Sequence, residues 1–281
     1  TVAYGTYRLG WGKPFTFRQL AERQQLIALV ASPEALTDVG VIDGTLLDWH
    51  SGRLTPITLA RRDEDYARAA RFLHEVHQFD RAALRPEDQT TYDVLEEQWR
   101  TALDFQRFPW LTAAGLYPLA PMDGVAAWIP GFLQFSHVVR NARSARHYVD
   151  RLRAFGDKLD QATAASEWQA AQGVVMPLAL VERSLEILRN SAPAEPEKSA
   201  LVTTFVERLS GVASLSEDGR AAGTAGACGG QRGDAHAAAR GGFAIPAAQH
   251  GRRTQGDAGA LPAVARRHGR TVAALLSRPA G

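Results

Sequence analysis

The feature that most limits what this chain can fold into is a change of composition near Gly219. From Gly219 to Gly281 the chain has 13 Gly, 18 Ala and 9 Arg residues, no Lys, Tyr or Trp, and a single large aromatic residue, Phe243. A segment of this kind has little apolar surface to bury, and such segments tend to stay disordered. We therefore predict a folded body followed by a disordered, low-complexity tail over residues 219–281.

The body that precedes this tail is mildly acidic. Its first 218 residues contain 23 basic and 28 acidic side chains, although the whole chain has a formal net charge of +2. No basic field is present in the body to attract nucleic acid. No apolar run approaches the ~20 residues needed to cross a bilayer. We therefore expect neither a nucleic-acid partner nor a transmembrane segment.

Apolar residues in the body recur three and four positions apart, the spacing that places them on one face of an α-helix. Strand signals are almost absent, so the spacing predicts a mainly α, multi-helix, bundle-like domain over residues 17–215 after an extension at 1–16. Capping residues predict helix starts after Thr55 and Ser144, and Gly173 is predicted as the residue that ends one helix. The predicted helices cover approximately residues 17–31, 56–79, 86–108, 144–172, 178–190 and 201–209.

Residues 109–130 interrupt this helical pattern. Their sequence, PWLTAAGLYPLAPMDGVAAWIP, is apolar but is broken repeatedly by proline and glycine, so neither helix nor strand periodicity lasts. We predict a buried, irregular crossing segment here. If the protein is a binding module, the segment from Tyr117 to Phe132 would form the ligand groove, and the candidate binding residues are Tyr117, Pro118, Trp128 and His137.

One short motif resembles a zinc-binding sequence. Zinc peptidases with an H-E-x-x-H motif place two histidine ligands four residues apart on a helix. In this chain His74-Glu75-Val76-His77 places them three apart, and no third ligand is identifiable. The alternative interpretation is two half-exposed histidines on a helix whose Val76 faces the core, so no metal site is predicted.

A second cluster brings Asp43, Asp48, Trp49 and His50 together in the loop at residues 43–56. Carboxylates beside an imidazole could act as general acids and bases. The favoured interpretation is structural: Asp43 makes a turn, Asp48 caps a short segment, and Trp49 fills the core. No dinucleotide-binding glycine pattern, P-loop, G-x-S-x-G elbow or zinc-ribbon cysteine pair is present.

Several spaced segments resemble, in the same order, the bacterial family known as domain of unknown function 885. The resemblance spans about residues 17–215. The segments that carry it are Ser32-Pro33-Glu34-Ala35-Leu36-Thr37-Asp38-Val39-Gly40, Tyr117-Pro118-Leu119, Gly124-Val125, Pro130, Phe132-Leu133, His137, Tyr148-Val149-Asp150-Arg151-Leu152 and Gly173-Val174-Val175-Met176-Pro177.

This resemblance implies a mostly helical fold similar to zinc-dependent peptidases, in a bacterial protein of the periplasm or cell envelope. It also implies an H-E-x-x-H motif far downstream, where histidines hold zinc and the glutamate activates water for attack on a peptide bond. The chain ends before that motif would appear. No catalytic or metal-binding residue is therefore carried over, and zinc is implied only for full-length family members.

The chain departs from the family pattern after Asp218, where more amphipathic helix would be expected. A frameshift in GC-rich coding DNA would explain the change, since the wrong frame yields mainly Ala, Gly, Arg and Pro codons. A genuine flexible tail is the alternative explanation. The DNA sequence across codon 218 distinguishes them.

The sequence thus favours an N-terminal helical fragment of a zinc-peptidase-like protein, inactive without its catalytic half. Its helices would form a scaffold and one wall of a cleft for a peptide substrate. The alternative is a helical ligand- or protein-binding module without catalysis. A third hypothesis is an enzyme that uses His74, Glu75 and His77 with zinc.

Overall fold

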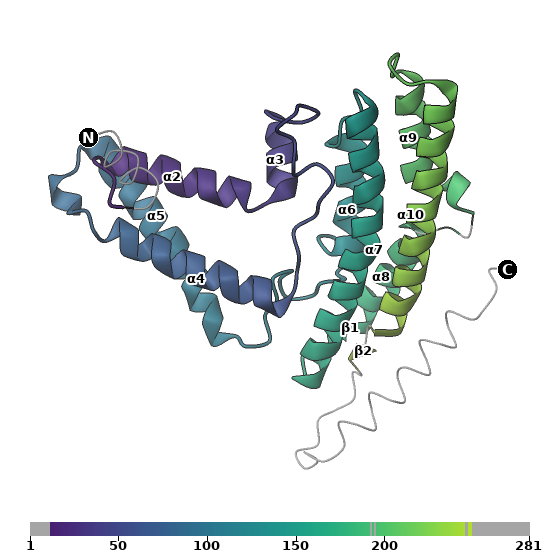
Figure 1. The fold of residues 1–281 in the computed structure, drawn as a ribbon. Helices are drawn as coiled ribbons and strands as arrows, with labels where there is room; N and C mark the ends of the chain where they lie inside the picture. The colour runs from purple at the N-terminus through teal and green to yellow at the C-terminus, as the bar shows by residue number, and fades with distance from the viewer. Residues whose placement is uncertain (1–11, 192, 194, 245–246, 249–281) are drawn as a thin grey trace, which may run out of the picture.

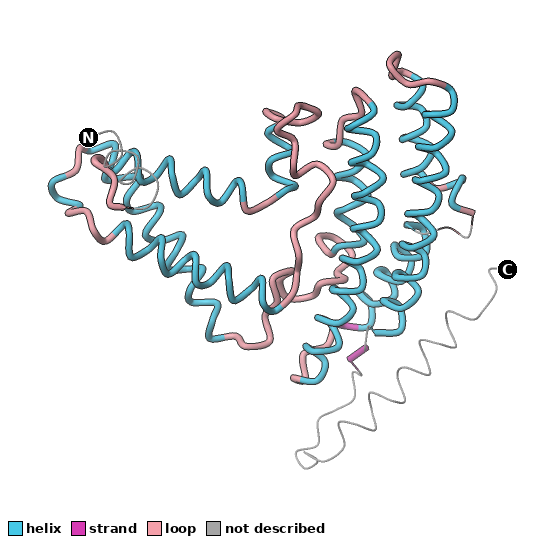
Figure 2. Tube along the Cα trace, in the orientation of Figure 1, coloured by secondary structure: helices cyan, strands magenta, loops and turns pink. Residues whose placement is uncertain are grey.

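The structure is a computed structural model that describes residues 12–191, 193, 195–244 and 247–248 (Figure 1). Helices account for most of these residues, which confirms the mainly α fold class (Figure 2). The α-helices are α2 (Phe17–Val30), α3 (Pro33–Val39), α4 (Leu59–Val76), α5 (Pro86–Asp104), α6 (Val125–Phe135), α7 (Ala142–Ala171), α8 (Leu178–Ser191), α9 (Ala200–Ser210) and α10 (Glu217–Ala244). Short 3-10 helices span Arg81–Ala83, Phe105–Arg107 and Pro196–Lys198, and strands β1 (Met176–Pro177) and β2 (Ala247–Ala248) pair in parallel.

The helices form two regions, which we call the arm (α2, α4 and α5) and the bundle (α6 to α10) (Figure 1). The arm has a small core of its own, made of Phe17, Leu20, Val76, Tyr92 and Leu95. The bundle has a larger core around α7. Its fully buried members with the largest aromatic and aliphatic side chains are Tyr148, Phe155, Phe205, Leu119, Ile129, Leu133, Leu152, Leu159 and Leu209.

Two helices begin at positions different from those predicted. The cap of α4 is Thr58 rather than Thr55, because the Thr58 hydroxyl accepts a hydrogen bond from Arg61 N at 3.2 Å. The cap of α7 is Asn141, and Ser144 instead completes a capping box one turn later. At its far end α7 stops as predicted, where Gly173 adopts a positive φ of 79° after the C-cap residue.

The predicted irregular crossing contains more helix than the sequence indicated, because α6 starts at Val125. Its apolar residues at 125, 126, 129, 132 and 133 all face the bundle core, and this burial compensates for the backbone donor that Pro130 lacks. The segment before α6 is irregular, as predicted. Gly124 ends that segment and must be glycine, since a Cβ there would lie 2.4 Å from the backbone of Ala120.

The region after Gly219 also differs from the sequence prediction. Residues 217–244 form α10, which packs along α7 (Figure 1). Its small side chains allow close approach: a Cβ added to Gly226 would lie 3.1 Å from Val149, and one added to Gly230 would lie 2.9 Å from Leu152. The disorder predicted for 219–281 therefore does not apply to residues 219–244, and residues 249–281 lie outside the described residues.

Candidate functional site

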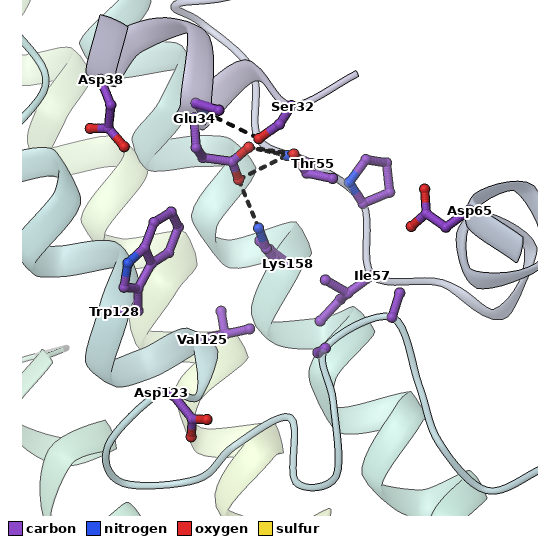
Figure 3. Close-up of a pocket in the computed structure, with 14 residues that line it drawn as sticks. Ser32, Glu34, Asp38, Thr55, Ile57, Asp65, Asp123, Val125, Trp128 and Lys158 are labelled. Carbon is purple, nitrogen blue, oxygen red and sulfur yellow. Dashed lines mark hydrogen bonds and ion pairs between the residues drawn. The ribbon is translucent and has the colours of Figure 1, made fainter. Parts of the chain in front are cut away.

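A cavity of about 380 Å³ lies where α3, α4, α6 and α7 meet, at the junction of the arm and the bundle (Figure 3). Its lining comes from residues far apart in the sequence. These residues are Ser32, Glu34, Ala35, Asp38, Thr55, Pro56, Ile57, Asp65, Ala113, Ala114, Asp123, Val125, Trp128 and Lys158. The mixture of apolar, aromatic and charged groups is typical of a small-molecule or peptide site.

A buried ion pair between Glu34 and Lys158 lies in this cavity. Lys158 Nζ is 2.8 Å from Glu34 Oε1, and both side chains are less than a tenth exposed. Glu34 also accepts hydrogen bonds from the backbone N–H of Thr55, at 2.9 Å, and from its hydroxyl. Burial raises the pKa of Glu34, but the charge and hydrogen bond of Lys158, together with Thr55, outweigh it and hold that pKa below its ordinary value.

The local sequence explains how Glu34 is held. Ser32 caps α3 by accepting a hydrogen bond from Ala35 N at 3.2 Å, and Pro33 occupies the first helical position. Glu34 therefore lies in the first turn of α3, where the helix dipole favours a negative charge. The cap and the position in the first turn of α3 place the Glu34 carboxylate at the edge of the cavity, facing α7.

Trp128 of α6 and two exposed carboxylates form the outer part of the cavity. Trp128 is 43% exposed and stacks on Phe132, with ring centroids 5.2 Å apart. Asp65 is already paired with Arg61 at 2.8 Å. Asp38 and Asp123, by contrast, form no ion pair among the described residues, so they leave the cavity with an excess of negative charge.

This arrangement suits a positively charged group that also carries an apolar portion. Lys158 Nζ lies 5.9 Å from the centre of the Trp128 ring, and Phe132 stacks on that ring, so Trp128 supplies apolar surface while the carboxylates of Asp38 and Asp123 supply Coulombic attraction for a cation. In Figure 3, Asp38 lies on the same side of the cavity as Trp128, whereas Asp65 lies on the opposite side. The compensated Glu34–Lys158 pair leaves Asp38 and Asp123 as the charged groups of the cavity that form no ion pair among the described residues.

The structure separates the four predicted groove residues. Trp128 lines the cavity, but Tyr117 is partly buried against the bundle core and Pro118 is buried in the segment before α6. His137 is buried elsewhere: its Nε2 lies 3.1 Å from the carbonyl of Ser144 and its Nδ1 lies 2.9 Å from Arg151. Burial, reinforced by the Arg151 charge, lowers the pKa of His137 to about 3, so it stays neutral.

The His74-Glu75-Val76-His77 sequence lies at the end of α4. His74 and His77 are exposed, and Val76 is fully buried, as predicted. His77 Nε2 lies 2.9 Å from Glu96 of α5. Among the residues that the structure describes, no three His, Cys, Asp or Glu side chains are arranged to bind a metal ion. The described residues therefore do not fit a zinc site.

Asp43, Asp48 and His50 do come together, but inside the protein. His50 is fully buried, with Nε2 2.9 Å from Asp43 and Nδ1 3.2 Å from Asp48. Burial raises the pKa of Asp48, yet hydrogen bonds from the backbone of Gly44 and Ser51 outweigh it and lower that pKa to about 2. The cluster therefore supports the loop. Trp49, predicted to fill the core, is instead 45% exposed.

The chain belongs to a bacterial family. A family model described as "Bacterial protein of unknown function (DUF885)" matches residues 33–241, which confirms the resemblance inferred from the sequence. The match continues across Gly219 and along most of α10, so the family relationship does not end at the composition change. No curated protein matches the chain.

A solved structure with a similar fold is that of a putative lipoprotein from Colwellia psychrerythraea. The TM-score is 0.63 at 12% sequence identity, and the similarity covers 79% of this chain and 41% of the other. At this identity the likeness concerns the fold alone. The chain thus spans less than half the length of the solved protein that it resembles.

Proposed function

We propose that this chain is the helical, substrate-binding part of a zinc-peptidase-like protein of the bacterial envelope. In this proposal the cavity at the junction of the arm and the bundle binds a positively charged group of a peptide. The observation that carries it is the cavity itself, where Trp128, Asp38 and Asp123 surround a compensated Glu34–Lys158 pair.

The catalytic part of this proposal depends on residues beyond those of the chain. Its 281 residues contain no H-E-x-x-H sequence, and the described residues hold no arrangement fit for a metal. Zinc would supply a Lewis acid and an activated water in a full-length protein. By itself the chain would then bind peptides without cleaving them. The name lipoprotein given to the structural relative supports a location in the envelope.

Binding of small peptides to the chain tests the cavity. We expect a lysine-containing dipeptide to perturb the backbone NMR signals of α3 and the N-terminal half of α6. The glutamate-containing counterpart should not do so. Asp38→Asn combined with Asp123→Asn should weaken the lysine dipeptide at least fivefold, because both carboxylates lie at the cavity without an ion pair. Glu87→Gln, on the exposed side of the arm, is the matched control.

Equal binding of both dipeptides would contradict the proposal, as would equal weakening by the control variant. Zinc content provides a separate test. Elemental analysis of the purified chain should find far less than one zinc ion per molecule. One zinc per chain, lost on His77→Ala, would instead support a metal site at the end of α4.

A further inference from the structure

The loop between α3 and α4 presents apolar side chains to solvent. Val41 is 75% exposed, Leu46 87%, Leu47 73% and Trp49 45%. We call residues 41–49 the apolar loop. Single exposed apolar residues are common on protein surfaces, but a group of them within nine residues marks a surface that contacts something else.

Buried polar contacts hold this loop in place. The carboxylate of Asp48 accepts hydrogen bonds from Gly44 N at 2.7 Å and from Ser51 N at 3.0 Å. His50 lies buried between Asp43 and Asp48. The acidic side chains of the loop are therefore turned inward, towards His50 and the backbone N–H groups of Gly44 and Ser51, which leaves the outer side of the loop apolar.

The apolar loop is also attached to the beginning of α7. The Asn141 amide donates a hydrogen bond to the Gly44 carbonyl at 3.3 Å, and His147 Nδ1 lies 3.2 Å from Asp48. Two further exposed apolar residues, Phe135 (84%) and Val138 (42%), lie just before α7. Residues 136–141 join α6 to α7, and the contacts of Asn141 and His147 with the apolar loop place that loop beside this junction, at one end of the bundle.

Three basic side chains lie near this end. Arg53, Arg140 and Arg146 are exposed, and none of them forms an ion pair among the described residues. The Arg53 guanidinium lies 5.7 Å from the centre of the Trp49 ring. Of the nearby acids, Asp150 pairs with Arg153 at 3.1 Å. Asp38 lines the cavity at the junction of the arm and the bundle. Glu217 and Asp218 begin α10, and the adjoining Gly219 lines a second cavity together with Arg146, so these two acids lie on the Arg146 side of this end.

We propose that this end of the molecule docks on an anionic phospholipid bilayer, with Leu46, Leu47 and Trp49 entering the interfacial region. Leucine and tryptophan are the side chains that partition well into that region, and nearby arginines attract anionic headgroups. An exposed apolar loop beside arginines that form no ion pair among the described residues matches a fluid, negatively charged surface. A protein partner would have to supply a matching concave apolar pocket with acidic neighbours.

A fluorescent probe on the full chain tests this docking. The buried Cys228 is replaced by alanine, and an environment-sensitive dye is attached to Leu47→Cys. Met122→Cys, which is 90% exposed before the other end of α6, carries the dye in the matched control. On vesicles of phosphatidylcholine and phosphatidylglycerol, we expect a blue shift and protection from an aqueous quencher at position 47, but not at 122.

A second variant tests how much the apolar loop contributes to the free energy of vesicle binding. Leu46→Glu combined with Leu47→Glu should lower the vesicle partition coefficient at least tenfold, with an unchanged melting temperature because both side chains are exposed. Vesicle binding without a shift at position 47 would mean attachment through another surface, such as the arginine-rich residues after 248, and would overturn the proposal. Absence of vesicle binding would also overturn it and favour a protein partner.

Discussion

Helices α7 and α10 lie side by side in the bundle, yet they contribute to their contact in opposite ways. On α7 the contact is made by branched side chains such as Val149 and Leu152, whereas on α10 it is made by Gly226 and Gly230. Glycine is among the weakest helix formers in isolation. The comparison shows that a helix poor in large side chains can still be stabilised when its partner supplies the apolar surface.

The compositional change at Gly219 therefore marks a change in how the core is built. Before it, each helix brings its own large apolar residues. After it, small residues of α10 bring the backbone close to α7, and Ala227 and Cys228 become buried. Close approach gains dispersion contacts that a larger side chain would prevent.

Of the predicted effects on the free energy of unfolding, we expect the largest from Asp234 of α10. This α10 side chain is fully buried beside Gly156 of α7, and its carboxylate forms no ion pair among the described residues. Burial raises the pKa of Asp234 to about 8. In the unfolded chain that pKa is about 3.9, so the folded state binds the extra proton between these values. The stability due to this group is therefore present below about pH 4 and is lost as pH rises towards 8.

Denaturant unfolding at pH 5, 7 and 9 measures this effect. With about 1.36 kcal/mol for each pKa unit between 3.9 and 8, the loss has an upper bound of roughly 6 kcal/mol. Asp234→Asn should remove most of it, so its free energy of unfolding should exceed that of the parent chain increasingly at higher pH. Asp218→Asn, at an exposed position of α10, should leave the pH profile unchanged. Parallel profiles for the parent chain and Asp234→Asn would refute the assignment.

Truncation on α7 should cost more than truncation on α10. Phe155→Ala removes a fully buried ring from the bundle core and should lower the free energy of unfolding by about 3–5 kcal/mol. Ala227→Gly, at an equally buried position of α10, should cost only about 1–2 kcal/mol, since it removes one methyl group and some helix propensity. Equal losses would show that side chains of α10 contribute as much to the core as the large side chains of α7, which would contradict the proposed difference between the two helices.

We expect the smallest change in stability from alanine substitutions at two adjacent glycines of α10. Gly230 faces Leu152, where an added Cβ would be only 2.9 Å away, whereas Gly229 has open space around it. Gly229→Ala should stabilise the chain by about 0.5–1 kcal/mol through helix propensity. Gly230→Ala should destabilise it by about 1 kcal/mol, because overpacking outweighs the same gain. Thermal unfolding of both variants measures the signs, and stabilisation by both would mean that α7 and α10 are not in close contact.

Periodicity predicted helices where each one carries its own apolar face. This explains why α2, α5, α7, α8 and α9 were located near their observed positions. It missed α3, a helix of only seven residues, and α10, whose stabilising side chains lie on α7. It also missed most of α6, because Pro130 and Gly124 indicated irregular structure although the residues between them were helical.

The cavity was harder to predict than the fold. Trp128 was a candidate because it is a large aromatic residue in an interrupted segment. The Glu34–Lys158 pair joins residues 124 positions apart, so only the tertiary arrangement could show it. His137 was selected from the family pattern, but that pattern gives no indication of whether a position lies on a surface or beneath it. Its contact with the buried Arg151 explains why it belongs to the interior.

The number of residues between His147 and Lys158 on α7 is constrained by the contacts that these two side chains make. His147 holds the apolar loop and Lys158 pairs with Glu34 in the cavity. Eleven residues at about 100° each return to nearly the same face after about three turns. Deleting or inserting one residue between them would rotate one position away from its partner. A substitution along this stretch alters the contacts of one residue, whereas a change in its length would separate the loop from the cavity in a single step.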